Sequence, residues 1–422
     1  MASLRFSGGR HIFKAVKRVL PGLILLLLAT GSPLAESLQE GMRKGVELYQ
    51  AGRLEEASEH FHQILDRNPS SEEARWNLAN TLAALGQKRF MAGQWEEARD
   101  YLEEALGYQP DEAAFHFLLG IILFKKGDLY SARLEAEEAL ESDPRYAAAH
   151  NLLGDIYYRE GHLDQAISEW EASLENAGNQ GAQIKEKTRR VRKEAEAERG
   201  FERDISRHFT LQSDGPVPRE VSQKVLEDLE EAYDELGSEL GHYPRSDIPV
   251  ILYSKVLFRE ITRSPSWVAG RYDGKIRVPV GGLSRGGDTR SLKPVLYHEL
   301  THAFLRSMAP QGLPRWFEEG LAKYFEGVTA EAALQWLERH PGPRFSSFEE
   351  LDIGLRGKPG LVDSAYINSF MAVWTLIDDQ GLWTVSRIIE EVGRGRSFPN
   401  AFKGEVRLEL SEFKEKWLES IP

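Results

Sequence analysis

Small residues recur at a fixed spacing through the first half of the chain, and this spacing limits the possible fold more than any other feature. Between Glu36 and about Gly178 helix formers dominate, and prolines interrupt them at positions 69, 110 and 144, the last two 34 residues apart. Counted from these prolines, glycines fall at Gly45, Gly86, Gly120 and Gly154, and alanines follow twelve residues later at Ala57, Ala98, Ala132 and Ala166. A small residue on each of two helices lets their backbones approach closely, and a proline then ends the second helix. The spacing therefore predicts four successive pairs of packed helices.

The four copies resemble tetratricopeptide repeats, and the resemblance implies an α-solenoid over residues 36–180. The interval from Pro69 to Pro110 is 41 residues, seven longer than the repeat, and the extra residues lie between positions 71 and 89. Because seven residues make two helical turns, we expect the first helix of that repeat to be longer, or to be kinked near Gly86. Solenoids bind partners along a concave surface, so the array is expected to recruit a protein partner or substrate through this groove.

Cations precede a short apolar run at the amino terminus. Residues 1–18 contain five Lys or Arg and no Asp or Glu, and residues 19–29 are almost all apolar. This order is typical of a signal peptide, whereas a membrane-spanning helix needs about 20 apolar residues and Pro21 and Gly22 interrupt this run. We therefore expect residues 1–35 to be a signal peptide that is removed near Ala35, and the protein to be periplasmic or secreted. A leader that stays in place would instead anchor the chain to a membrane.

The overall charge and the lack of cysteine exclude several kinds of site. The chain carries 53 Lys and Arg against 66 Asp and Glu, a formal net charge of −13, which argues against nucleic acid as a partner. It has no cysteine, so disulfides, cysteine-bound zinc and thiol catalysis are excluded. Any metal must be held by histidines and carboxylates. The histidines within the repeats, such as His116 and His150, are expected to have surface or inter-helix roles.

The composition changes after the repeats. Residues 181–205 are highly charged with little apolar periodicity, which predicts a solvated helical cap or a linker. A second domain is expected over residues 206–422, and it begins with strand-like, helix-like and strand-like segments at residues 208–213, 217–240 and 248–253. Residues 270–282 contain an Asp-Gly turn between strand-like residues, which predicts an antiparallel hairpin or an edge strand.

The motif that carries chemistry is His298-Glu299-Leu300-Thr301-His302, in a segment of helical character. On a helix, residues i and i+4 lie on one face, so both imidazoles can reach a single ion while Glu299 projects beside it. Two imidazoles and a carboxylate suit Zn²⁺, and an open fourth position admits the water that zinc acidifies. The carboxylate should come from a nearby second helix. Residues 315–325 read as such a helix, and helical geometry alone does not choose between Glu318 and Glu319.

The sequence HELTHAF, followed by LPRWFEEGLAKYFE, resembles the gluzincin metallopeptidases, specifically the bacterial peptidase-MA-like group often found behind tetratricopeptide repeats. The resemblance covers about residues 205–422 and implies an α+β zinc metallopeptidase domain. It also implies that Glu319, directly before the glycine of its motif, is the third zinc ligand, and that Glu299 is the general base. Tyr366 and Ser369 resemble the family's downstream Tyr-x-x-Ser segment, which gives Tyr366 a candidate role in catalysis. Tyr366 would donate a hydrogen bond to the oxyanion of the transition state, although a core role is equally compatible with its sequence.

Two functions are compatible with these features. In the first, the protein is an exported zinc metallopeptidase whose repeats recruit a peptide or protein substrate. The segment GRYDGKIRVPVGG (residues 270–282) stands where the related aminopeptidases have a Gly-x-Met-Glu-Asn motif, which favours an endopeptidase, and its edge strand could pair with a substrate backbone. In the alternative, the protein is a non-catalytic scaffold of repeats with a metallopeptidase-like binding domain.

Overall fold

The computed structural model describes most of the 422 residues in two compact units. It covers residues 33–176, 181–214, 217–245, 247–264, 268–280, 291–340, 345–357 and 359–421. The first unit comprises residues up to 158 with 165–188, and the second comprises 159–164 with 189–421. Nearly all of the expected signal peptide, and the last two residues of the expected hairpin segment, lie outside the described residues. Within the described ranges, no helix combines the length and the apolar character needed to cross a membrane.

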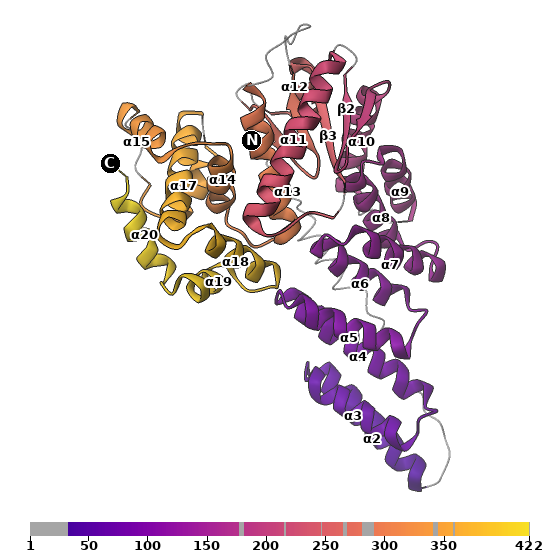
Figure 1. Ribbon diagram of the computed structural model, residues 1–422. Helices are drawn as coiled ribbons and strands as arrows, with labels where there is room; N and C mark the ends of the chain where they lie inside the picture. The colour runs from indigo at the N-terminus through magenta and orange to yellow at the C-terminus, as the bar shows by residue number, and fades with distance from the viewer. Residues whose placement is uncertain are drawn as a thin grey trace. The chain divides into compact units, whose positions relative to one another are not determined.

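The first unit is a stack of helix pairs (Figure 1). The pairs are α2 (Pro33–Gln50) with α3 (Leu54–Arg67), α4 (Glu72–Met91) with α5 (Trp95–Tyr108), α6 (Ala113–Lys126) with α7 (Leu129–Ser142), and α8 (Ala147–Glu160) with α9 (Leu163–Asn176). The predicted alanines of the second helices are fully buried. A Cβ added at Gly86 would lie 3.0 Å from the carbonyl oxygen of Ala98, and one added at Gly120 would lie 3.3 Å from that of Ala132. The small residues therefore lie where the paired helices touch, as the spacing predicts.

The first helix of the second pair is longer than its counterparts. Helix α4 has 20 residues, whereas α3 and α5 to α9 have 14 each. Its start is capped by Ser71, whose hydroxyl accepts a hydrogen bond from the backbone nitrogen of Ala74. Six of the seven extra residues of this repeat therefore lengthen a single helix, which is the first of the two expected arrangements.

The second unit is built on a mixed five-stranded sheet with the strand order β1-β2-β3-β5-β4. The strands are β1 (Glu202–Ile205), β2 (Phe209–Ser213), β3 (Ile248–Tyr253), β4 (Arg271–Tyr272) and β5 (Ile276–Pro279). Strands β2, β3 and β5 run parallel, and β1 and β4 are antiparallel to their neighbours. The predicted strands and the Asp273-Gly274 hairpin are confirmed, and Gly274 has the positive φ of +106° that such a turn requires. Strand β1 lies inside the segment that we expected to be a cap or linker.

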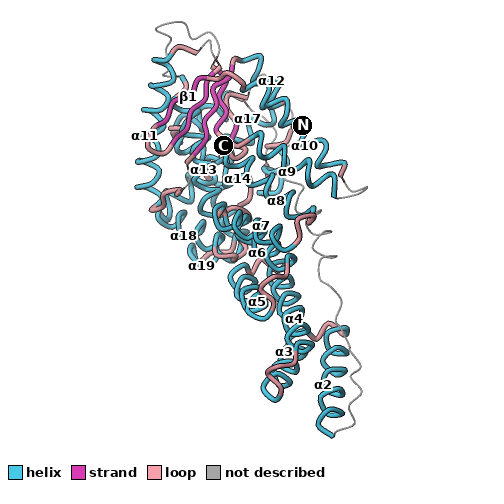
Figure 2. The backbone as a smooth tube through the Cα atoms, turned by 90° about the vertical axis from the view of Figure 1, so that its right-hand side faces the viewer, coloured by secondary structure: helices cyan, strands magenta, loops and turns pink. Residues whose placement is uncertain are grey.

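Helices cover both faces of this sheet. On one face, α11 (Arg219–Leu240) and α13 (Lys293–Met308) pack on alternate strand residues such as Leu211, Val250 and Val278. On the other face, α12 (Lys255–Thr262) brings Phe258 against Ile251 and Tyr253. Figure 2 shows the strands between α11 and α12. Because successive side chains of a strand point to opposite faces of the sheet, apolar residues of the strands pack against helices on both faces.

The charged segment after the repeats forms a helix in which most charged side chains are exposed and two acidic ones are buried. Helix α10 (Ala182–Glu198) buries Glu194 and Glu198. Glu194 accepts hydrogen bonds from Lys275 Nζ at 3.0 Å and from Arg277 Nη2 at 2.7 Å. Glu198 bonds with the Tyr253 hydroxyl, which also accepts from Arg277 Nη1 at 2.6 Å. Two acidic residues of this helix are therefore buried by pairing with side chains of the sheet, while others, such as Arg192 and Lys193, are exposed.

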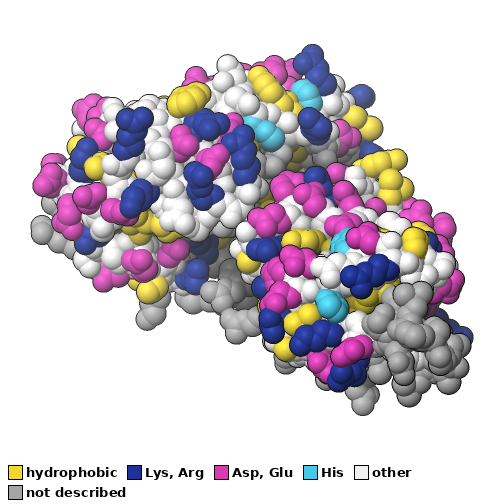
Figure 3. All heavy atoms as spheres, turned by 90° about the horizontal axis from the view of Figure 1, so that it is seen from below, with side chains coloured by type: hydrophobic (Ala, Val, Ile, Leu, Met, Phe, Trp, Pro, Cys, Tyr) yellow, Lys and Arg dark blue, Asp and Glu magenta, His cyan; other side chains and the backbone are white. Residues whose placement is uncertain are grey.

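The rest of the second unit is helical. It comprises α14 (Arg315–Phe325), α15 (Ala330–Arg339), α16 (Phe348–Gly354), α17 (Pro359–Gln380), α18 (Leu382–Gly393), α19 (Phe398–Val406) and α20 (Leu410–Glu419). These helices share one hydrophobic core with α11, α13 and the sheet. On the face seen in Figure 3, acidic and basic side chains are intermixed and do not separate by sign.

Candidate metal centre

Helix α13 presents its two histidines on the side opposite the core. Pro294 lies in its first turn, where a missing backbone N–H costs no helical hydrogen bond. Leu296, Leu300 and Phe304 recur every fourth residue and are fully buried in the core. Thr301 is also buried, and its hydroxyl donates to the carbonyl of Tyr297. Leu300 and Thr301 therefore have structural roles, and His298 and His302 are left half-buried on the other side.

Helix α14 is fixed at its start by the core. Trp316 and Phe317 are buried there, and the Trp316 ring stacks on Phe348 with centroids 4.2 Å apart. The Trp316 backbone nitrogen donates to the Asp352 carboxylate of α16 at 2.7 Å. Because Pro314 at the N-cap makes no side-chain cap hydrogen bond, Asp352 supplies the missing acceptor. These contacts set the direction of the helix that carries Glu318 and Glu319.

Gly320 sets how closely α14 approaches α17. A Cβ at this position would lie 2.3 Å from the carbonyl oxygen of Ser369 and 2.6 Å from Cγ2 of Val373. Both distances are shorter than any ordinary contact, so only glycine fits here. The Glu-Gly pair of the sequence motif therefore has a physical basis. The glycine lets α14 pack against the helix that carries Tyr366, and the preceding glutamate points toward α13.

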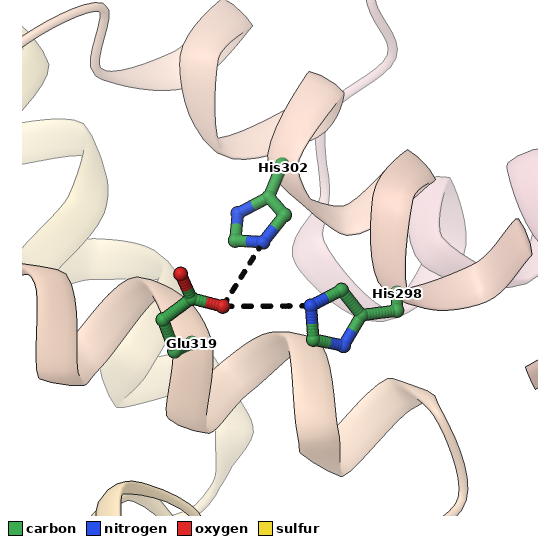
Figure 4. Close-up of side chains that lie close together, drawn as sticks. All are labelled: His298, His302 and Glu319. Atoms are coloured by element: carbon green, nitrogen blue, oxygen red, sulfur yellow. Dashed lines mark ion pairs between the residues drawn. The ribbon is translucent and has the colours of Figure 1, made fainter. Parts of the chain in front are cut away.

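Three of the predicted side chains converge. Oε2 of Glu319 lies 3.4 Å from Nε2 of His298 and 3.4 Å from Nε2 of His302. All three potential ligand atoms lie within 4.8 Å of one another, and Figure 4 shows both imidazoles turned toward the carboxylate. Two ligands about 2.1 Å from a tetrahedral ion are about 3.4 Å apart. The donor set and its spacing therefore fit Zn²⁺, and Glu318 is not part of it.

Glu319 Oε2 also lacks a hydrogen-bond partner although it is buried. Buried polar atoms are almost always paired, so an unpaired carboxylate oxygen that faces two imidazole nitrogens fits an atom whose partner is a cation. The other oxygen, Oε1, accepts from Arg315 Nε at 3.3 Å. This second contact holds the carboxylate in place and leaves Oε2 free to bind.

Hydrogen bonds and burial shift the pKa values of the site. Burial disfavours the charged form of His298, but the close carboxylates of Glu319 and Glu326 raise its pKa to about 9. The pKa of Glu319 is lowered well below its usual value, because His302, His298 and Arg315 outweigh the effect of burial. In the metal-free chain these charges stabilise an imidazolium–carboxylate pair. A metal must displace that proton in order to bind.

The orientation of His298 depends on a residue that the sequence analysis missed. Its Nδ1 lies 2.8 Å from Oε2 of Glu326, which also pairs with Lys323 Nζ at 2.7 Å. A carboxylate on the outer nitrogen of a ligating histidine fixes the ring and its tautomer. Glu326 follows Glu319 by seven residues, two helical turns, so the helical period placed it on the correct face. No spacing rule indicated its partner.

Glu299 lies at the base of the site without entering the triad. Its carboxyl is buried, and burial raises its pKa. A Cβ at Gly270, the residue before β4, would lie 2.7 Å from Glu299 Oε1. The edge of the sheet therefore packs directly on this carboxyl group, and glycine provides the space for it.

Tyr366 lies beside the triad. Its ring centroid is 6.3 Å from that of His298, and Lys323 Nζ lies 5.6 Å from the tyrosine ring. The negative charge of Glu319, together with burial, raises the pKa of Tyr366 far above its usual value. The hydroxyl therefore keeps its proton and can donate it in a hydrogen bond. The side chain also packs against the core, so its position is compatible with both roles expected for it.

Family models identify the first unit. One model, described as tetratricopeptide repeat, matches residues 43–111, and a second model of the same description matches residues 84–139 and 131–182. The chain carries tetratricopeptide repeats. The predicted repeat array is therefore confirmed over residues 43–182.

Solved tetratricopeptide structures are similar to this chain at low identity. TTC0263, a thermophilic tetratricopeptide protein of Thermus thermophilus, is 21% identical, with 36% of this chain and 98% of that chain covered and a TM-score of 0.23. YrrB, described as a tetratricopeptide protein with an unusual peptide-binding site, is 17% identical, with coverages of 39% and 94% and a TM-score of 0.28. An O-GlcNAc transferase of Thermobaculum terrenum is 16% identical, with coverages of 53% and 38% and a TM-score of 0.26. No curated protein sequence matches the chain.

Proposed function

We propose that the second unit is a zinc-dependent hydrolase of peptide bonds, and that the repeats bind its substrate or a partner protein. The observation that carries this proposal is the convergence of His298, His302 and Glu319, with ligand atoms spaced as on a tetrahedral ion. The same Oε2 of Glu319 is buried and has no hydrogen-bond partner, which fits an atom that binds a cation.

The two histidines and Glu319 would hold the ion. A zinc ion held there supplies a Lewis acid and a water of lowered pKa. Glu299 accepts the proton of the attacking water on its carboxylate and later donates it to the leaving amine. The raised pKa of this buried carboxyl suits a group that must both take up and release a proton.

The remaining side chains orient the reacting groups. Glu326 holds the His298 ring through Nδ1, and Arg315 holds Glu319 through Oε1. Tyr366 donates from its hydroxyl to the oxygen on which negative charge develops. The choice of a peptide bond as the electrophile rests on the resemblance to gluzincin metallopeptidases, and the preference for an endopeptidase rests on residues 270–282.

The second candidate function is a scaffold that binds proteins without cleaving them. The tetratricopeptide matches favour it, because solenoids of this kind serve as binding surfaces. In this case the histidine-rich site would hold a structural ion or a ligand. We keep the expectation of an exported, periplasmic or secreted protein as part of either proposal.

Metal analysis combined with a digest of a peptide library separates the two functions. The hydrolase predicts close to one zinc per chain, cleavage by the wild type, and retained zinc with lost cleavage in Glu299→Gln. Cleavage that persists in Glu299→Gln would contradict the role of the base. Stoichiometric zinc without cleavage of any peptide or bound partner would favour the scaffold.

The chain offers a matched pair of variants for the ligand assignment. Glu319→Gln and Glu318→Gln make the same change at neighbouring positions of α14. The first should lose zinc, because an amide is a poor substitute for the ligand carboxylate, and the second should retain it. Equal loss in both variants would show that the effect comes from the fold of α14 and not from ligation.

A further inference from the structure

One histidine of the repeats connects three segments of the first unit through both of its ring nitrogens. His116 lies in the first turn of α6. Its Nδ1 is 2.7 Å from Oε2 of Glu135 on α7, and its Nε2 is 2.7 Å from the carbonyl oxygen of Pro110 in the turn after α5. The His116 side chain is only 13% exposed. Glu112, the N-cap of α6, makes no side-chain cap hydrogen bond. The His116 imidazole instead links the first turn of α6 to the turn after α5.

The chemistry of the two partners determines the protonation state of the ring. A carboxylate and a carbonyl oxygen can only accept hydrogen bonds. A neutral imidazole has a single N–H, whereas an imidazolium has two. Both hydrogen bonds of His116 can therefore exist together only when the ring is charged. Loss of one proton removes one of the two bonds and also the ionic contact with Glu135.

The same arrangement recurs one repeat later. His150, 34 residues after His116, lies 2.7 Å from Glu169 through Nδ1 and 3.1 Å from the Pro144 carbonyl through Nε2. One repeat earlier the equivalent positions, 82 and 101, hold Leu82 and Tyr101. The arrangement is therefore a feature of the third and fourth repeats, and it is tightest at His116.

The charges around His116 favour the imidazolium. Glu135 and Glu138 face it from α7, and the turn after α5 contributes the Pro110 carbonyl. Asp111 and Glu112 in that turn are also acidic. The hydrogen bond with Glu135 is the largest cause that raises the pKa of His116, and it outweighs the opposing effect of burial.

We propose that His116 is a pH-sensitive clamp that holds the second repeat to the third only while its ring carries both protons. Because folding raises the affinity of the ring for its second proton, the clamp stabilises the array fully below the pKa of the unfolded chain. Its contribution is lost as the pH rises through the pKa of the folded chain. A rise in pH through the folded-state pKa therefore loosens the start of α6 and the turn before it.

The test is a titration of the His116 ring in the full chain by ¹⁵N nuclear magnetic resonance. The ring should titrate at a higher pH than it does in the chain unfolded by urea, and both of its nitrogens should be protonated at the pH where the ring in urea has already lost its second proton. Amide hydrogen exchange in the first turn of α6, corrected for the intrinsic effect of pH, should accelerate over the same range. A ring that titrates at or below its value in urea would overturn the proposal.

Glu135→Gln is the decisive variant, because it removes the charge and keeps the size of the side chain. It should shift the His116 titration toward lower pH, and the acceleration of exchange should shift with it. Glu169→Gln makes the same change one repeat later and should leave the His116 titration where it is. An unchanged titration in Glu135→Gln, or an equal shift in both variants, would refute the clamp.

Discussion

Replacement of Gly320 by alanine tests how the fold builds the metal centre. The added Cβ would lie 2.3 Å from the Ser369 carbonyl oxygen, whereas carbon and carbonyl oxygen usually stay about 3.3 Å apart or more. Helices α14 and α17 must therefore separate by about 1 Å at this point. Overpacking of this kind costs about 1–3 kcal/mol of unfolding free energy. Metal sites tolerate errors of only about 0.2 Å in ligand distance, so Glu319, the preceding residue, should lose its ligand position.

The assay for Gly320→Ala is zinc affinity, measured by competition with a chromogenic chelator, together with urea unfolding of the full chain. Even loss of an orienting partner lowers metal affinity by about 10–100-fold, so displacement of a ligand helix should lower it by at least that much. Gly360→Ala is the control, because it adds the same atom to α17 at a position with no neighbour within 4 Å. If Gly320→Ala bound zinc as tightly as Gly360→Ala, the link between helix spacing and ligation would be refuted.

Three further predictions concern the site and its support. Zinc affinity should fall by up to about tenfold per pH unit below the His298 pKa of about 9, because the metal must displace the proton of the imidazolium. Isothermal titration calorimetry at several pH values measures this affinity. An affinity that does not depend on pH would contradict the prediction. Glu326→Gln should weaken zinc binding by about 10–100-fold in the chelator assay, and unchanged affinity would show that Nδ1 needs no carboxylate. Arg277→Met leaves the buried Glu194 with one cation fewer. The free energy of unfolding, measured in urea, should fall by about 3–5 kcal/mol. A stability equal to that of the wild type would show that the charge of Glu194 does not depend on Arg277.

The spacing of residues along the chain was enough to predict the contacts between residues that lie close in sequence. The Gly and Ala positions predicted the repeat pairs because each pair touches within a dozen residues, and the longer α4 followed from a count of residues. The ligand histidines followed from the helical period, since His298 and His302 lie four residues apart on one helix. These features depend on the geometry of a helix and little on the rest of the fold.

Distant partners could not be predicted in this way. The charges of α10 indicated a solvated segment, but Glu194 pairs with Lys275 and Arg277, which follow it by 81 and 83 residues. The choice of Glu319 over Glu318 depends on how α14 packs on α17, and only Gly320 in the sequence hints at that packing. His116 was expected to have either a surface or an inter-helix role, and the sequence indicated neither of the acceptors that its two nitrogens contact.

The most direct test of the metal centre is the zinc X-ray absorption spectrum of the wild-type chain after removal of metal and reloading with one equivalent of zinc. We predict two imidazole nitrogens about 2.0–2.1 Å from the ion, with carboxylate and water oxygens completing four-coordination, and loss of the carboxylate contribution in Glu319→Gln. A chain that retains no zinc after reloading, or a spectrum without imidazole scattering, would contradict the account.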